Sequence, residues 1–140
     1  MTKKIRIIIA DDHLLIAETW ATLINMDPEF EVVKVYDNTK SLIDEITDVK
    51  PDIAILDINI NPFSGIEATK IIREKRNLTT PIIGLSANAL REEVSICKSA
   101  GMNDYLVKPY TENQLVDVML SHLNEMKDQP TSPKVFIQNL

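Results

Sequence analysis

The sequence is poor in cysteine and lacks long apolar runs. Its single cysteine, Cys97, cannot form an internal disulfide, as is usual for proteins of a reducing compartment. The apolar run near the N-terminus spans only about five residues before two aspartates interrupt it, whereas a secretory signal needs roughly 7–15. No run reaches the ~18 apolar residues of a membrane span. We therefore expect a cytoplasmic protein.

Glycine and clustered positive charge are also scarce. The glycines are Gly65, Gly84 and Gly101, so the first strand–helix turn lacks the glycines that a nucleotide- or flavin-binding fold requires. The net charge is −6, and basic residues cluster only at residues 3–6 and 73–76. Because phosphate contacts need a positive surface, we expect no direct binding of nucleic acid by this domain.

Short apolar runs recur along the chain, at residues 5–10, 31–36, 52–57, 81–86 and 104–108. They are rich in Ile and Val and most do not alternate with polar residues, which is typical of strands buried on both faces of a parallel sheet. Helical spacing follows each run, at residues 12–26, 39–48, 65–76, 89–100 and 111–124. This order predicts an α/β fold: a doubly wound five-stranded parallel sheet with helices on both faces.

Residues suited to helix ends flank these helical stretches. The expected N-caps are Asp12, Thr39, Asn88 and Thr111, the last with Gln114 three residues on as in a capping box. Gly101 follows the fourth predicted helix as a C-cap.

Polar side chains gather where the predicted strands end, namely Asp11 and Asp12, Asp57, Ser86 and Lys108. Because ligands of parallel α/β sheets bind at the carboxyl ends of the strands, these side chains are expected to converge. Three carboxylates together repel one another, which Lys108 and a divalent cation would offset. Hard oxygen ligands without a Cys/His cluster favour Mg²⁺ over zinc. Such a site is suited to receive and hold a phosphoryl group.

The stretches IIIADDHLLIAE, AILDINI and YLVKP resemble the receiver domain of two-component response regulators. The spacing is close to that of chemotaxis-type single-domain receivers, and the ADDH opening is similar to receivers that precede helix-turn-helix outputs. The resemblance covers about residues 4–124 and implies the flavodoxin-like receiver fold. Five motifs in order at matching strand ends make it specific.

The resemblance implies roles for the acidic residues. Asp57 matches the aspartate that a histidine kinase or histidine phosphotransfer protein phosphorylates. Asp11 and Asp12 match the acidic pair that places Mg²⁺ together with Asp57, and the backbone carbonyl of Asn59 matches a further metal ligand.

The resemblance also implies roles on the fourth and fifth strands. Ser86 matches the hydroxyl that moves to the phosphoryl group, and Lys108 the lysine that pairs with it. Tyr105 falls at the aromatic that swings inward on activation, and half-buried packing of a strand residue is the alternative. Ala87 matches the small residue that lets the phosphodonor approach, and the peptide bond before Pro109 is expected to be cis.

The loop after Asp57 departs from the family pattern. Receivers usually carry Met-Pro where this chain has Ile60 and Asn61, with the proline one place later at Pro62, and often an aspartate where Ser64 stands. Gly65 is kept, so the loop has the expected length. The shape of this loop and the lifetime of the phosphoryl group are thereby left open.

We expect a receiver domain at residues 1–125 and a linker or tail at 126–140, with an apolar patch at 135–137. The domain is expected to be a phosphoacceptor rather than an enzyme with a separate substrate, beyond its own phosphoryl transfer and slow dephosphorylation. Phosphorylation would switch the face of the fourth helix, fifth strand and fifth helix, where a homodimer would form. We expect the receiver to be N-terminal, either as a stand-alone regulator or as part of a longer DNA-binding regulator.

Two rival functions fit the same fold. A pseudo-receiver would act as an interaction module without phosphorylation, but such domains usually lose an acidic residue or the lysine, and this chain keeps both. An aspartyl-phosphate phosphatase carries a second aspartate two residues after its nucleophile, whereas Asp11 is followed at that spacing by His13.

The remaining distinctive residues are expected to be structural. Trp20 shares a predicted helical stripe with Ile16, Leu23 and Ile24, which favours core packing over partner docking. Cys97 is expected to be a buried hydrophobe. His13 and His122 have no partners at metal-ligand spacing and are expected to be solvated or capping.

Overall fold

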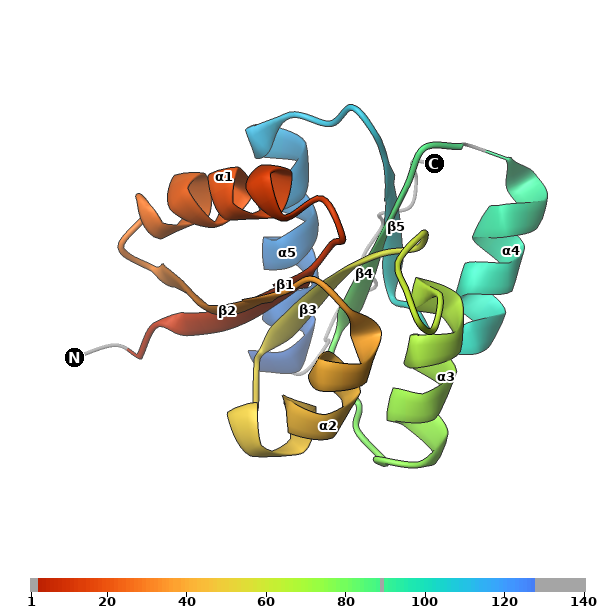
Figure 1. The fold of residues 1–140 in the computed structure, drawn as a ribbon. Helices are drawn as coiled ribbons and strands as arrows, with labels where there is room; N and C mark the ends of the chain where they lie inside the picture. The colour runs from red at the N-terminus through yellow and green to blue at the C-terminus, as the bar shows by residue number, and fades with distance from the viewer. Residues whose placement is uncertain (1–2, 89, 128–140) are drawn as a thin grey trace.

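Five parallel strands form the centre of the molecule. The computed structural model describes residues 3–88 and 90–127, with the side chains described as far as residue 123. The strands are β1 (Ile5–Ala10), β2 (Phe30–Tyr36), β3 (Ile53–Asp57), β4 (Ile82–Ser86) and β5 (Asp104–Val107). They lie in the order β2-β1-β3-β4-β5, so β3 is central (Figure 1). The carboxyl ends of all five strands therefore meet at one edge of the sheet.

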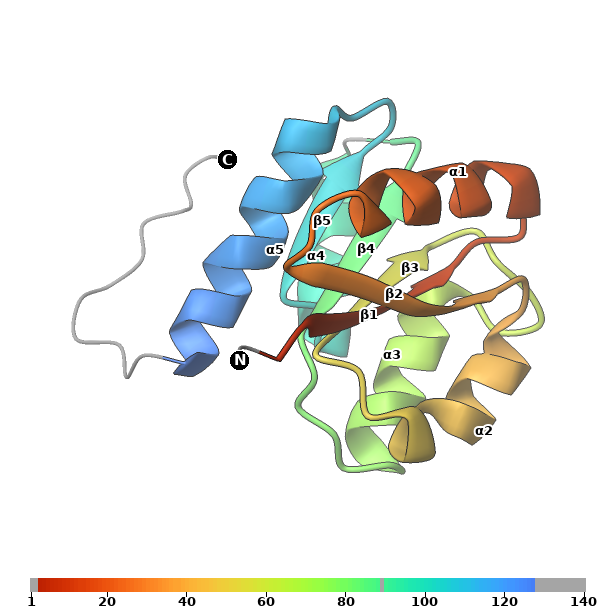
Figure 2. The ribbon, with the colours of Figure 1, turned by 90° about the vertical axis from the view of Figure 1, so that its left-hand side faces the viewer.

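Five helices cover the two faces of the sheet. They are α1 (Leu14–Asn25), α2 (Thr39–Val49), α3 (Gly65–Glu74), α4 (Arg91–Ala100) and α5 (Glu112–Lys127). Helices α1 and α5 lie on one face, and α2, α3 and α4 on the other (Figure 2). Each face closes its own apolar core: Ile7, Ile9 and Ile55 point toward α1 and α5, whereas Ile8 and Leu56 point toward the other three helices. Neighbouring residues of a strand point to opposite faces, which explains the continuous apolar runs.

The predicted fold class and all ten elements are confirmed, with ends shifted by a few residues. Helix α5 continues to Lys127, beyond the predicted end at 124, and the apolar patch at 135–137 lies outside the described residues. The capping box of Thr111 and Gln114 is present, and Gly101 is the C-cap of α4 with φ of 111°.

Three predicted N-caps are wrong. Helix α1 is preceded by His13 rather than Asp12, because the turn is closed by the Asp11 carboxylate accepting from the His13 N–H. Asn38, not Thr39, caps α2. Helix α4 begins at Arg91 after Leu90, so Asn88 lies in the preceding loop, where its backbone is used by other residues.

The predicted stripe of α1 is only partly correct. Ala17, Ala21 and Ile24 form its buried face, whereas Ile16 is 48% exposed. Trp20 is half-buried against the α1–α5 core and stacks on Tyr110, with 4.9 Å between the ring centroids. Cys97 is fully buried, as expected, and burial raises the pKa of its thiol to about 11.

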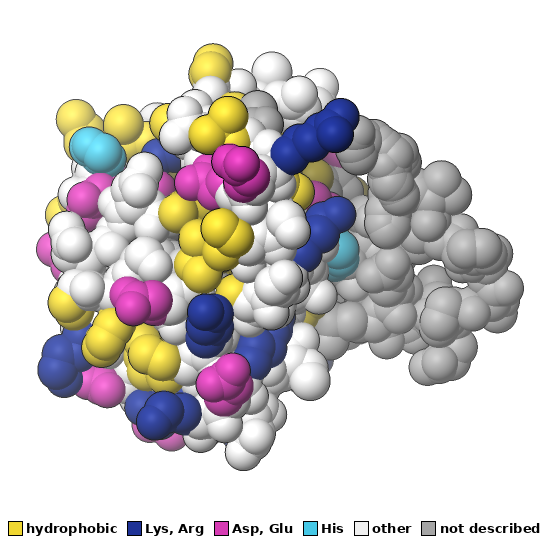
Figure 3. Space-filling model, turned by 90° about the vertical axis from the view of Figure 1, so that its right-hand side faces the viewer, with side chains coloured by type: hydrophobic (Ala, Val, Ile, Leu, Met, Phe, Trp, Pro, Cys, Tyr) yellow, Lys and Arg dark blue, Asp and Glu magenta, His cyan; other side chains and the backbone are white. Residues whose placement is uncertain are grey.

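The surface mixes charges of both signs. On the face that carries α3 and α4, acidic and basic side chains intermingle with separate hydrophobic ones (Figure 3). Among the described residues, none of the helices has the length and apolar character needed to cross a membrane.

Candidate functional site

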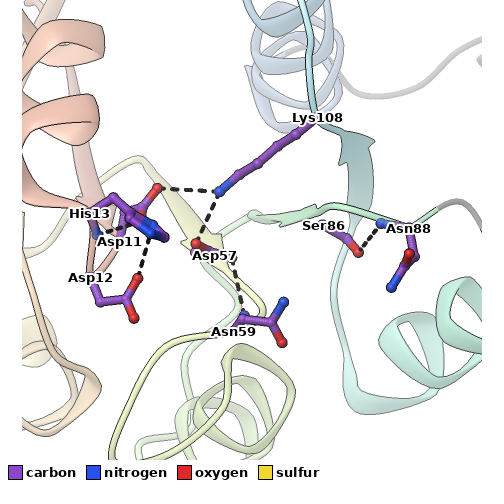
Figure 4. A network of polar contacts seen from close by, with 8 residues as sticks. All are labelled: Asp11, Asp12, His13, Asp57, Asn59, Ser86, Asn88 and Lys108. Carbon is purple, nitrogen blue, oxygen red and sulfur yellow. Dashed lines mark hydrogen bonds and ion pairs between the residues drawn. The ribbon is translucent and has the colours of Figure 1, made fainter.

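An acidic cluster lies at the carboxyl edge of the sheet. We use this name for Asp11, which follows β1, its neighbour Asp12, Asp57 at the end of β3, and Lys108, which follows β5 (Figure 4). Asp11 and Asp57 are only 2% and 3% exposed. Burying ionised carboxylates is unfavourable unless they are paired, so their partners determine what the site can do.

Lys108 bridges the two buried carboxylates. Its Nζ lies 3.1 Å from Asp57 Oδ2 and 3.6 Å from Asp11 Oδ2. Burial lowers the pKa of Lys108, but the hydrogen bond and charge of Asp57, together with the charge of Asp11, outweigh it and raise the pKa above its usual value. Lys108 therefore stays protonated and holds the two aspartates at one point.

One lysine does not neutralise the cluster. Burial, and then the charge of Asp57, raise the pKa of Asp11 above its ordinary value, although the His13 N–H and Lys108 act in the opposite direction. Asp12 is exposed beside them, with Oδ1 3.2 Å from His13 Nδ1. The site keeps an excess of negative charge.

The donor set fits a divalent cation. One ligand atom from each of Asp11, Asp12, His13 and Asp57 lies within 4.8 Å of the others. His13 is exposed as expected, but it does have potential ligand partners, contrary to the prediction. Three carboxylates with room for water suit a hard cation such as Mg²⁺, whereas a single imidazole is too few for a zinc site.

The loop between β3 and α3 is fixed to α2. The Thr39 hydroxyl accepts from the Phe63 N–H at 2.9 Å and donates to the Phe63 carbonyl at 2.8 Å, and the Thr39 N–H donates to the Asn61 carbonyl. Thr39 thus holds this loop from the side, which explains why it does not cap its own helix. The Asn61–Pro62 peptide bond within the loop is cis, as is Lys108–Pro109.

Two features keep Asp57 in place beneath this loop. The Asn59 N–H donates to Asp57 Oδ1 at 3.1 Å, while the Asn59 side chain points away from the cluster (Figure 4). The start of α3 lies against the backbone of Asp57: a Cβ added at Gly65 would lie 2.6 Å from the Asp57 backbone carbonyl oxygen. Ser64 caps α3 in a full capping box with Glu67, so the helix start is rigid.

A second cluster lies further along the same edge, and we call Ser86, Glu93 and Tyr105 the hydroxyl cluster. Ser86 is 1% exposed; its Oγ donates to Glu93 Oε1 at 2.5 Å and accepts from the Asn88 N–H at 3.0 Å. The Tyr105 hydroxyl lies 2.6 Å from the same Glu93 oxygen and also within hydrogen-bonding distance of the Asn88 carbonyl. Ala87, next to Ser86, is exposed.

Tyr105 is partly buried, as one reading of the sequence expected, and its role as a switch stays a prediction. Its ring is half-buried against the core beneath α2, α3 and α4, and its hydroxyl reaches the hydroxyl cluster. Burial and the hydrogen bond to Glu93 raise the pKa of Tyr105 to about 12. The phenol is therefore protonated at neutral pH and acts as a donor.

Glu93 was not found from the sequence. It stands beside Glu92 in the first turn of α4, where acidic residues are common because they complement the helix dipole. The sequence offers no signal that one of two adjacent glutamates points at Ser86.

The prediction for His122 is wrong. It is buried, 6% exposed, with Nε2 2.9 Å from Asp104 Oδ2, so α5 is tied to the start of β5 by this contact. The two residues are distant in sequence, so their pairing follows from the packing of α5.

Comparison with known proteins agrees with this geometry. The sequence model of the response regulator receiver domain matches residues 7–120. The transcriptional regulatory protein DegU of Brevibacillus brevis is 29% identical over 83% of this chain and 49% of its own length. A protein-glutamate methylesterase/protein-glutamine glutaminase of Nocardioides is 32% identical over 75% of this chain but only 29% of its own length. The receiver domain of the Francisella response regulator 1452 superposes with a TM-score of 0.79 at 27% identity, over 87% of this chain and 98% of that one.

The chain belongs to the response regulator receiver domain family. Domains of this family act in two-component signalling, and their general function is switching by phosphorylation. The chain spans about half the length of DegU and less of the methylesterase, so these relatives carry further parts beyond the segment that is matched.

Proposed function

We propose that Asp57 is the phosphoacceptor and that the acidic cluster binds Mg²⁺. The observation that carries this proposal is the position of Lys108 Nζ, 3.1 Å from Asp57 Oδ2 and 3.6 Å from Asp11 Oδ2. A buried carboxylate beside a lysine and two further carboxylates is suited to transfer of a phosphoryl group from a donor that supplies it.

The chain's own residues position the reaction. An Asp57 carboxylate oxygen forms a bond to the phosphorus of a phosphohistidine donor while the bond from phosphorus to the histidine nitrogen breaks. The nitrogen keeps the electron pair of that bond and takes a proton from water, so the donor histidine leaves as a neutral imidazole. Lys108 stabilises the charge on the transferred oxygens, and the Asn59 N–H orients Asp57. Asp11, Asp12, Asp57 and the Asn59 carbonyl would hold Mg²⁺, which supplies further neutralisation of the phosphoryl charge.

Membership of the family supports a proposal for the wider role. We infer a cytoplasmic phosphoacceptor that receives its phosphoryl group from a histidine kinase or histidine phosphotransfer protein and has no separate substrate. Residues 1–125 form the receiver, and 126–140 a linker or tail. The output is a change at the face of α4, β5 and α5, which is the proposed homodimer surface; any DNA binding belongs to a part outside this domain. A pseudo-receiver remains the alternative because it shares the fold.

Incubation with acetyl phosphate tests the proposal. With Mg²⁺ the protein should gain one phosphoryl group by intact mass, and the gain should be lost on adding hydroxylamine, which cleaves acyl phosphates. Asp57→Asn should abolish the gain because an amide does not form this acyl phosphate.

Asp48→Asn, a change at an exposed aspartate of α2, serves as the matched control and should be phosphorylated like the parent. A parent protein that binds Mg²⁺ but gains no phosphoryl group would support the pseudo-receiver instead.

A further inference from the structure

The Ser86 hydroxyl is already engaged in the unphosphorylated protein. It has one proton, which it donates to Glu93 Oε1 at 2.5 Å, and it accepts from the Asn88 N–H. Its burial leaves protein groups as its partners. The hydroxyl therefore has no further proton with which to bond an oxygen on a neighbouring phosphoryl group.

Ser86 is nevertheless next to the place where such a group would be. Asp57 pairs with Leu85 in the register of β3 and β4, so Ser86 is the following residue at the same edge. The Lys108 N–H donates to the Ser86 carbonyl at 2.7 Å, which ties Ser86 to the strand that delivers Lys108. For Ser86 to donate to a phosphoryl oxygen on Asp57, its hydroxyl must leave Glu93.

We propose that Glu93 is a latch whose carboxylate holds the hydroxyls of Ser86 and Tyr105 and so opposes the phosphorylated state. The inference rests on the proposed role of Asp57 as phosphoacceptor. The inference adds Glu93 to that role as a positioning residue that lies outside the acidic cluster.

The latch is a competition between two anions for one proton. A hydrogen bond to an ionised acceptor is roughly twice as strong as one between neutral groups. The net free energy that favours the Ser86 bond to a phosphoryl oxygen is therefore only the difference between the strength of that bond and the strength of the bond to Glu93. Because this difference is small, Ser86 returns to Glu93 when the phosphoryl group is removed.

The latch also joins the site to a helix. Glu93 lies in the first turn of α4, whereas Ser86 ends β4 and Tyr105 belongs to β5. Release of both hydroxyls removes two contacts that tie α4 to the sheet. Phosphorylation of Asp57 therefore changes the attachment of α4 through Ser86 and Glu93.

Affinity for beryllofluoride, a stable mimic of the phosphoryl group, measures the latch. The full chain with Mg²⁺ is titrated with BeF₃⁻ by calorimetry, for the parent, Glu93→Gln and Glu93→Ala. Glu93→Ala should bind about tenfold more tightly, which corresponds to about 1.4 kcal/mol, and Glu93→Gln, which keeps a neutral acceptor, should fall between it and the parent. Glu92→Gln, the same change at the exposed neighbour, should leave affinity within about twofold.

The Ser86→Ala background separates the latch from simple charge repulsion. If Glu93 acts through the Ser86 proton, the effect of Glu93→Gln on affinity should shrink once Ser86 is alanine, because only the Tyr105 contact then remains; an effect of unchanged size there would overturn the latch. Equal affinity of the parent and both Glu93 variants would also overturn it, while leaving the phosphoacceptor role intact. No binding by the parent would overturn the proposed function and the latch together.

Discussion

The acidic cluster and the hydroxyl cluster occupy one edge of the sheet but are organised in opposite ways. In the first, one cation, Lys108, lies between two buried carboxylates; in the second, one carboxylate, Glu93, lies between two hydroxyls. The acidic cluster holds more negative charge than its lysine neutralises. In the hydroxyl cluster each donor already has an acceptor.

This difference separates two tasks. Burial, and then the charge of Asp57, raise the pKa of Asp11, so its ionised form is disfavoured and a cation bound beside it would lower the free energy of the acidic cluster. The hydroxyl cluster must instead give up existing bonds before it can contact a new group. Under the proposed function, capture of the metal and the phosphoryl group depends on residues at the ends of β1, β3 and β5, and the proposed resistance to switching depends on β4, α4 and Tyr105.

Among the substitutions that test this division, removal of Lys108 should change the rate of phosphorylation most. In Lys108→Ala the buried carboxylates of Asp11 and Asp57 lose their shared cation, and the transferred phosphoryl group loses a donor. Phosphorylation by acetyl phosphate should slow by about 100-fold, as for loss of one stabilising donor at a reacting centre. The rate is followed by intact mass.

Two controls accompany this variant. Lys98→Ala, which removes an exposed lysine of α4, should phosphorylate at the parent rate. Lys108→Ala itself should leave the hydroxyl cluster intact, so the Tyr105 ring signals in NMR spectra should keep their positions. Normal phosphorylation of Lys108→Ala would contradict the role given to this lysine.

Substitution of Asp11 should show the excess charge directly. Asp11→Asn retains an oxygen to accept from the His13 N–H but removes one charge, so Mg²⁺ affinity should fall by about tenfold. Without metal, the same variant should gain about 0.5–1 kcal/mol in free energy of unfolding at pH 7, measured with urea.

The sign of this gain depends on pH. Because burial, and then the charge of Asp57, raise the folded-state pKa of Asp11, the parent loses stability as pH rises through that pKa; below it Asp11 is protonated, and neither the cost of burying its charge nor the repulsion from Asp57 remains. The advantage of Asp11→Asn should thus shrink as pH is lowered toward 4. Asp12→Asn, at the exposed neighbour, should weaken Mg²⁺ binding without this stabilisation; a stability gain equal to that of Asp11→Asn would argue against burial as the cause.

The acidic cluster was predictable from the sequence because a simple rule places it. Parallel strands end at one edge, so residues that directly follow apolar runs, such as Asp11, Asp57 and Lys108, must meet there once the strand order is known. No knowledge of helix orientation is needed. The fold was predictable for a similar reason, since runs such as 53–57 are buried on both sides.

The hydroxyl cluster and the loop contacts were not predictable in this way. The partner of Ser86 depends on how α4 rotates over the sheet, which decides that Glu93 rather than Glu92 points inward. Thr39 satisfies a local capping rule, yet its hydroxyl is used by Phe63 across the molecule, and Asn38 takes the cap. Local rules see neighbours along the chain, whereas these contacts are made by packing.

Loss of the Tyr105 hydroxyl should have the smallest effect and gives the sharpest test of whether the two clusters are independent. Tyr105→Phe keeps the half-buried ring and removes one donor to Glu93, so the free energy of unfolding should fall by about 0.5–1 kcal/mol in thermal or urea unfolding. Mg²⁺ affinity and the rate of phosphorylation by acetyl phosphate should match the parent, because Tyr105 has no contact with Lys108 or the aspartates among the interactions described. A change in Mg²⁺ affinity beyond about twofold would mean that the clusters are already coupled before phosphorylation. The acidic cluster and the hydroxyl cluster would then not act independently, and the division of metal and phosphoryl binding from switching would not hold.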